Sequence, residues 1–306
     1  AVMTACGTAG QKAATDAGNP FLAEYSTPFG VPPFDLIKVE HYKEAFLKGM
    51  EEQKKEIDAI VNQRSVPDFD NTIAAFDQSG ELLNKVSTVF SGLNSCNTND
   101  EMQAFNKEIT PLLSAHRDDI SLNPALFARV KEVYERREKL GLDKEQNKLL
   151  EETYKKFVRG GANLDSVDQA KLRQLNSEIS MLQLTFGQNL LKETNAFELV
   201  IDKKEDLAGL PESLVASAAE AAKGAGMEEK WLFTLHNPSV MPFLQYADNR
   251  ELREKIFKGY INRGNNGNEA DNNEIVKKLV ALRLEKAKLM GYADYASFIL
   301  EDRMAK

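Results

Sequence analysis

The chain has 306 residues, of which 42% are hydrophobic and 28% are charged, with 18 Gly and 10 Pro. This composition excludes collagen-like, low-complexity and mainly disordered chains, and the length fits one large domain or two smaller ones. No run of residues approaches the roughly 18 apolar residues of a membrane span. The net charge is −8 and the basic residues are scattered. Because nucleic-acid binding requires a concentrated basic face, no nucleic-acid partner is expected.

Residues 1–18 predict a leader remnant and a flexible tether rather than a folded element. Met3, Thr4 and Ala5 precede Cys6 in a small, apolar stretch, as at the end of a bacterial lipoprotein signal. We therefore expect Cys6 to be a lipidation site and the location to be the bacterial cell envelope or periplasm. The membrane is then a partner only through this lipid anchor. The alternative is a tail with an incidental cysteine on a cytoplasmic protein.

The body of the chain, residues 19–306, is predicted to be mostly α-helical. The Pro-rich and aromatic residues 19–34 predict an extended arm across a surface. Apolar residues at three-and-four spacing, with capping residues and glycines, predict helices over 71–93, 102–116, 124–140, 143–158, 165–194, 211–224, 248–261 and 271–290. Two short aromatic and β-branched segments, residues 196–202 and 231–236, predict a small two-stranded β element.

Residue spacing predicts no catalytic or metal-ligating residue in this chain. His41, His116 and His236 lie far apart, and no HExxH motif is present, so we expect structural roles for all three. No GxSxG, GxxxxGK[ST] or GxGxxG motif occurs either. Cys6 and Cys96 cannot form a disulfide framework or a thiolate zinc site, and Cys96 has no neighbouring histidine that would activate it.

The Asn-rich segment 262–273 invites comparison with a calcium-binding loop. With Gly267 at the sixth position of such a loop, Gly264 falls where a ligand is required and Asn273 falls where the bidentate glutamate belongs. This mismatch favours a capped surface loop.

Both ends of the body resemble one enzyme family. The amino-terminal segments are 19–22 (NPFL), 28–35 (PFGVPPFD) and 37–42 (IKVEHY), and the carboxy-terminal segments are 249–257 (NRELREKIF), 282–292 (LRLEKAKLMGY) and 293–298 (ADYASF). In this order they resemble the amino-terminal part of bacterial peptidyl-dipeptidases and oligopeptidase A, which belong to the thimet oligopeptidase family of zinc metallopeptidases. The PFGVPPFD segment favours a peptidyl-dipeptidase, which releases dipeptides from the carboxyl end of its substrate.

The resemblance implies that residues 19–306 form one helical wall of a two-lobed channel that admits short unfolded peptides. Family members are about twice this length, and their HExxH helix and third zinc ligand, a glutamate, lie beyond the equivalent of Lys306. The zinc ion and the catalytic residues of the full-length enzyme are therefore expected in the missing carboxy-terminal half, which would be a partner of this segment. We expect the segment alone to hold no zinc and to be inactive. The alternative is a helical module that binds peptides without cutting them, or that serves as a scaffold.

Overall fold

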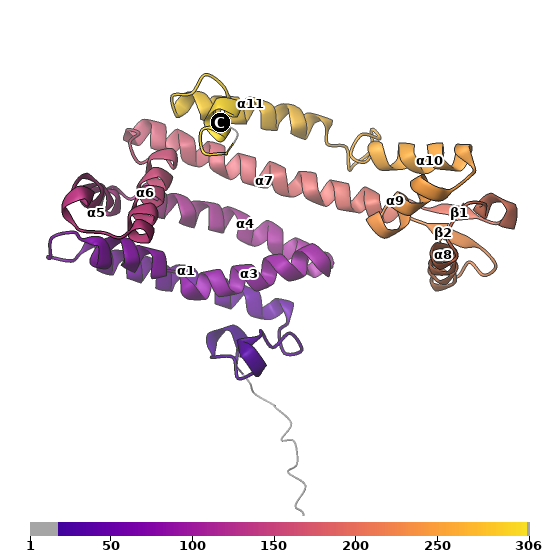
Figure 1. Ribbon diagram of the computed structural model, residues 1–306, viewed down its shortest axis with the longest axis horizontal. Coiled ribbons are helices and arrows are strands. Elements are labelled where there is room, and N and C mark those ends of the chain that lie inside the picture. Colours follow the sequence, from indigo (N-terminus) through magenta and orange to yellow (C-terminus); the bar gives the residue numbers. More distant parts are fainter. Residues whose placement is uncertain (1–17, 305–306) are drawn as a thin grey trace, which may run out of the picture. The chain divides into compact units, whose positions relative to one another are not determined.

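The structure is a computed structural model that describes residues 18–304, and it divides the chain into two compact units (Figure 1). Unit 1 is Ala1–Asn163 and unit 2 is Leu164–Lys306. Helices dominate both units, and the described residues contain one two-stranded sheet. The prediction of a mostly α fold with a small β element is thus confirmed.

The described part of unit 1 is entirely helical apart from its loops. Two 3₁₀ turns, Pro20–Leu22 and Pro28–Gly30, lie in the segment predicted as an extended arm. The helices are α1 (Val39–Val61), a π-helical turn (Phe69–Ala74), α2 (Ala75–Gln78), α3 (Glu81–Cys96), α4 (Asp100–Ser121), α5 (Pro124–Glu135), a 3₁₀ turn (Arg137–Lys139) and α6 (Lys144–Arg159).

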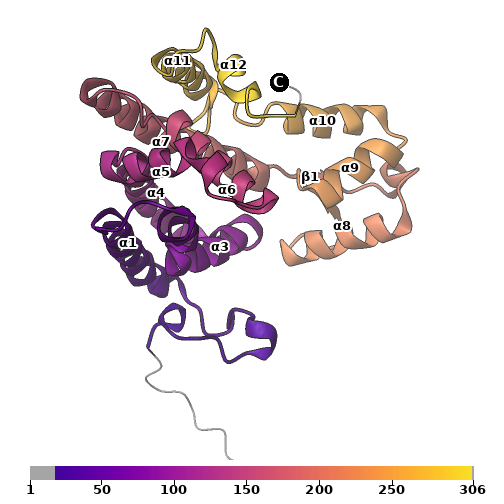
Figure 2. The same ribbon diagram turned by 60° about the vertical axis from the view of Figure 1, so that its left-hand side comes forward.

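Unit 2 begins with the longest helix and contains the sheet. Its elements are α7 (Ser166–Ala196), β1 (Leu199–Ile201), a 3₁₀ turn (Lys204–Leu207), α8 (Glu212–Gly224), β2 (Trp231–Phe233), α9 (Asn237–Tyr246), α10 (Arg250–Ile261), α11 (Asn273–Leu289) and α12 (Tyr295–Leu300). β1 and β2 are antiparallel, with Leu199 opposite Phe233. Figure 2 shows α8 and α9 gathered around this sheet, and α11 packs along α7.

Helix α1 connects the two apolar clusters of unit 1. At its amino-terminal end Tyr42 and Phe46 are buried in the first cluster, and at its carboxy-terminal end Ile57 and Ile60 are buried in the second. α1 packs against α3, α4 and α5. Near the middle, a Cβ atom on Gly49 would lie 2.9 Å from the backbone of Leu83 in α3. Glycine at this position therefore permits the close approach of α1 and α3.

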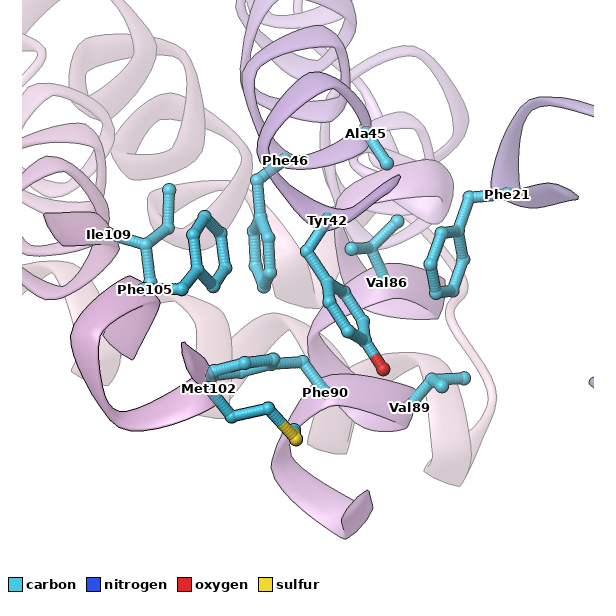
Figure 3. Packing of buried hydrophobic residues seen from close by; sticks show 10 residues of the cluster. All are labelled: Phe21, Tyr42, Ala45, Phe46, Val86, Val89, Phe90, Met102, Phe105 and Ile109. Atoms are coloured by element: carbon cyan, nitrogen blue, oxygen red, sulfur yellow. The ribbon is translucent and has the colours of Figure 1, made fainter. Parts of the chain in front are cut away.

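The first cluster is built around the ring of Tyr42 (Figure 3). The Tyr42 ring centroid lies 5.0 Å from that of Phe90 and 5.2 Å from that of Phe21. Phe21 is buried, so part of the arm is docked into the core rather than lying across a surface. No residue among 18–304 offers the buried Tyr42 hydroxyl a hydrogen bond. Burial, together with the Tyr25 hydroxyl, raises the pKa of Tyr42 to about 12.

The helix predicted over residues 71–93 is interrupted, so that prediction is wrong in part. Gly80 adopts a left-handed conformation with φ 78° between α2 and α3, and its N–H donates to the Glu56 carboxylate at 2.7 Å. The amino-terminal cap is Asp68, whose carboxylate accepts from the N–H of Asn71 at 2.7 Å. Glycine is the residue that adopts such a backbone at low cost, so Gly80 ends one helix and begins the next.

The π-helical turn is held by a buried arginine. The Arg129 guanidinium donates to the Asn71 side-chain oxygen at 2.9 Å and to the Thr72 hydroxyl at 3.3 Å. It also donates to the carbonyl oxygens of Gln63 and Ser65. Four oxygen acceptors therefore surround this buried cation, and they compensate for part of its lost hydration.

Most other predicted helices of the body are confirmed with small shifts at their ends, while α1, α9 and α12 have no counterpart among the predicted ranges. The starts of α6 and α7 match their predicted caps, because the side chains of Asp143 and Asp165 accept backbone N–H groups there. α9 contains Pro238 and Pro242, which disguise its helical pattern.

One carboxylate organises the Asn-rich loop of unit 2. Glu193, at the end of α7, is only 9% exposed. It accepts hydrogen bonds from the backbone N–H of Gly264 and from the side-chain amides of Asn266 at 2.9 Å and Asn268 at 2.6 Å. Burial alone would raise the pKa of Glu193, but these three hydrogen bonds together lower it below its ordinary value. The loop between α10 and α11 is thus tied to α7.

We predict that Tyr42→Phe does not destabilise unit 1 at pH 8, because the phenol hydroxyl has no hydrogen-bond partner to lose among the described residues. Because the pKa of Tyr42 is raised in the folded state, its phenol ionises at a lower pH in the unfolded chain than in the folded one. The contribution of the neutral phenol to the free energy of unfolding is therefore complete below pH 10 and is lost as pH rises toward 12. Tyr42→Phe should therefore weaken the loss of stability above pH 10. Urea unfolding at pH 8 and pH 11 measures both effects, with Tyr246→Phe as an exposed control. A loss of more than about 1 kcal/mol at pH 8 would contradict the prediction.

We predict that Glu193→Gln destabilises unit 2 by about 1–3 kcal/mol at pH 7, because an amide cannot accept all three hydrogen bonds. Since the folded-state pKa is lowered, the carboxylate stabilises the fold above the ordinary value of 4.5 and ceases to do so as pH falls through the lower folded value. The difference between variant and parent should therefore shrink in acid. Thermal unfolding between pH 3 and pH 7 tests this, with Glu269→Gln, an exposed residue of the same loop, as the control.

Candidate functional site

Two histidines of unit 1 are engaged in local structure. His41 lies in the first turn of α1, where its Nδ1 accepts from the backbone N–H of Lys38 at 3.0 Å. His116, in α4, is half-buried, and its Nε2 lies 2.8 Å from Oε1 of Gln53 in α1. Because that amide oxygen can only accept, Nε2 of His116 donates. Burial is the main cause that lowers the pKa of His116, so its imidazole is neutral at pH 7.

The third histidine, His236, lies in unit 2 just before α9 rather than within a strand. Its Nδ1 is 3.0 Å from the Thr234 hydroxyl, and its Nε2 is 3.1 Å from the side-chain oxygen of Asn195. Both ring nitrogens are therefore engaged.

No group of three or more His, Cys, Asp or Glu side chains within residues 18–304 is arranged to hold a metal ion. The Asn-rich loop turns N–H donors toward Glu193, whereas a calcium site would turn oxygens toward the ion. The Asn-rich loop therefore lacks the ligand arrangement of a calcium site.

The two cysteines are in different situations. Cys96, the last residue of α3, is exposed, and its thiol donates to the carbonyl oxygen of Gly92 at 3.1 Å. Cys6, the expected lipidation site, lies outside the described residues. No helix in the described part of the chain is both long and apolar enough to cross a membrane.

A groove of about 1080 Å³ lies in unit 1, and we call it the α3–α4 groove. α3 contributes Leu83, Asn84, Ser87 and Ser91 to its wall, and α4 contributes a face from Leu113 to Ser121. Gln53 of α1 also lines it, together with residues of α2 and α6.

The polar groups inside the α3–α4 groove are partly linked to one another. Gln53, which contacts His116, also donates to the carbonyl oxygen of Ser79 at 3.4 Å. The Ser79 hydroxyl donates to the carbonyl oxygen of Phe76 at 2.7 Å. These contacts join α1, α4 and the turn before α3. His116 therefore connects helices and carries no charge that would attract a ligand.

A second, smaller cavity of about 410 Å³ lies in unit 2 between α8, β2 and α9. Hydroxyl groups and prolines line it, and His236 is part of its wall. Asp, Glu, Lys and Arg are absent from the residues that line it.

Sequence reasoning did not find the α3–α4 groove. Its polar residues Asn84, Ser87 and Ser91 recur at three-and-four spacing along α3. They form a polar stripe that is distinct from the apolar stripe of the same helix. A polar stripe of this kind is indistinguishable in sequence from an ordinary solvated helix face, so only the position of α4 reveals it.

Comparison with known proteins connects this helical chain with a family of peptidases. Residues 243–306 match the sequence model of peptidase family M3. Dipeptidyl carboxypeptidase of Escherichia coli (strain K12) is 41% identical over 288 residues, which are 94% of this chain and 42% of that protein. Its Salmonella typhimurium counterpart shows the same identity and coverage. Oligopeptidase A of Haemophilus influenzae is 29% identical over 283 residues, which are 90% of this chain and 41% of that protein.

The chain thus spans about two fifths of the length of these relatives. A match over 94% of the chain includes residues of both units. The matches confirm the resemblance to bacterial peptidyl-dipeptidases and oligopeptidase A over nearly the whole chain, and the match to the model of peptidase family M3 covers residues 243–306.

Proposed function

We propose that this chain is the amino-terminal portion of a zinc metallopeptidase that acts on short unfolded peptides and releases dipeptides from their carboxyl ends. The observation that carries the proposal is its 41% identity to dipeptidyl carboxypeptidase over 94% of the chain. The lower identity of 29% to oligopeptidase A favours the peptidyl-dipeptidase over the oligopeptidase.

In this proposal the zinc ion and the catalytic residues belong to the part of the protein that lies outside these 306 residues. Three observations support it. The sequence lacks HExxH, and the described residues do not form a zinc site. The chain covers only 42% of the relative to which it is 41% identical, which leaves more than half of such a protein to supply the metal centre. The described residues would form part of the framework that receives the peptide.

A stripe of exposed apolar side chains on α11 supports the existence of a further packing partner. Val276, Val280 and Leu284 are 45%, 62% and 38% exposed. Their spacing of four residues places them on one face of the helix. Leu279 and Ala287 of the same helix are buried, and α11 packs on α7. We propose that the carboxy-terminal catalytic half covers this stripe.

Attachment to the membrane is a separate proposal. A lipid on Cys6 would tether the peptidase to the bacterial envelope, with the following residues as a spacer, and peptides of the periplasm would then be its substrates. The motif that supports it is the short apolar stretch before Cys6. The alternative is a cytoplasmic protein without a lipid.

A second candidate function is peptide binding without hydrolysis, and the α3–α4 groove is the observation that favours it. Reading the source gene beyond the codon for Lys306 separates the two candidates. A continuing frame that encodes HExxH and a downstream glutamate ligand supports the peptidase. A stop codon directly after Lys306 favours the binding module.

We predict that the purified 306-residue chain does not hydrolyse a quenched-fluorescent peptide and does not bind stoichiometric zinc. The longer protein expressed from the same gene should cleave the peptide and should lose this activity in a chelator. Fluorescence increase and metal analysis measure the two properties. Chelator-sensitive hydrolysis by residues 1–306 alone would place a metal centre in this chain and overturn the proposal.

We predict that Val276→Lys combined with Val280→Lys reduces self-association of the 306-residue chain, because two exposed apolar side chains are replaced by charged ones. In the longer protein the same change should lower the thermal stability, because the stripe is then an internal interface. Light scattering and thermal unfolding measure the effects, and Lys278→Gln on an exposed part of α11 is the control. Equal stability of the longer protein and its variant would show that the stripe is not covered.

A further inference from the structure

The α3–α4 groove has the length and the lining of a site for an extended ligand. Leu83 to Ser91 on α3 and Leu113 to Ser121 on α4 are each nine residues long, and the eight steps from end to end correspond to about 12 Å along each helix. That length accommodates three or four residues of extended peptide at about 3.3 Å per residue.

Two cations in the α3–α4 groove are available to a ligand. Arg117, on α4, and Lys156, on α6, both line it. Both are exposed, and neither side chain makes a hydrogen bond or ion pair with another residue among 18–304. They lie on neighbouring structure, because Ser121, one turn after Arg117, approaches Gly160, one turn after Lys156. A carboxylate is the ligand group that an arginine and a lysine in one groove recognise well.

The acidic residues of the groove limit the charge of the ligand. Asp77 and Glu81 also line it, so two negative charges balance the two positive ones, and His116 is neutral. A groove with no net charge does not favour a polyanion such as phosphate over a ligand with a single carboxylate.

One wall of the groove offers hydrogen-bonding groups at regular intervals. Asn84, Ser87 and Ser91 lie on the same face of α3, and their side chains make no hydrogen bond within the described part of the chain. They can therefore bond to successive peptide groups of an extended chain. Leu113 and Phe157 add apolar surface for the side chains of such a ligand.

We propose that the α3–α4 groove binds short peptides that have a free carboxyl end, with Arg117 and Lys156 taking the carboxylate and the polar face of α3 contacting the peptide backbone. This inference rests on the second candidate function, peptide binding at the α3–α4 groove, and adds which end of the peptide is bound and which residues contact it. It concerns binding by unit 1 itself, and it needs neither zinc nor hydrolysis.

Isothermal titration calorimetry of the 306-residue chain with the tripeptide Ala-Ala-Phe tests the proposal. We expect saturable binding to the parent chain, and a loss of about tenfold in affinity for Arg117→Gln, for Lys156→Gln, and for the parent with the carboxy-terminally amidated peptide. Inorganic phosphate should bind more weakly than the peptide. Lys230→Gln, an exposed change in unit 2, is the matched control and should leave the affinity unchanged.

Measuring the parent and Arg117→Gln with both the free peptide and its amide tests whether Arg117 itself contacts the carboxylate. If Arg117 contacts the carboxylate, Arg117→Gln should distinguish the free peptide from its amide less well than the parent does. Ser87→Leu, which fills the groove, should abolish binding while thermal unfolding confirms that the variant is folded. Absence of binding to the parent, equal affinity for the amide, or unchanged affinity in Arg117→Gln would overturn the proposal. Hydrolysis by the longer protein would then still support the peptidase, so the two proposals fail separately.

Discussion

Burial of α1 is the constraint on which the arrangement of unit 1 depends. This helix carries apolar residues of two separate clusters at its two ends, and α3, α4 and α5 all pack on it. Gly49 sets the closeness of α1 and α3, and the contact of Gln53 with His116 links α1 to α4. The α3–α4 groove is therefore a product of how two helices are placed on a third. Its polar residues on α3, which are Asn84, Ser87 and Ser91, are not part of the apolar clusters that place these helices.

The fold was largely predictable because capping residues in the sequence mark where many of its helices begin or end. Asp143 and Asp165 cap helices in the structure as the sequence indicates, and the two short strands pair as expected. The predicted helix boundaries are wrong where tertiary contacts, rather than the local sequence pattern, determine the backbone conformation. The apolar spacing continues through Gly80, yet a left-handed backbone and a bond to Glu56 divide the helix there. The buried Arg129 stabilises a π-helical turn, and no local sequence pattern predicts that contact.

The candidate site was much less predictable than the fold. Motif spacing indicated no familiar catalytic arrangement in this chain, and that stays a prediction. The groove, however, combines side chains from α1, α2, α3, α4 and α6. Each of its charged residues, such as Arg117 and Lys156, looks in sequence like any solvated helix position. Only the packing shows that they share a cavity, and only comparison with relatives connects the chain to peptides.

The single tryptophan of the chain gives the two units different optical properties. Trp231 lies in β2, opposite Ile201, and packs against the apolar cluster of unit 2. The described core of unit 1 contains phenylalanine and tyrosine instead. Tryptophan emission consequently reports on unit 2 alone, whereas far-ultraviolet circular dichroism reports on the helices of both. Superimposable transitions from the two signals would mean that the units unfold as one cooperative body, and separated transitions would reveal two folding units within one chain.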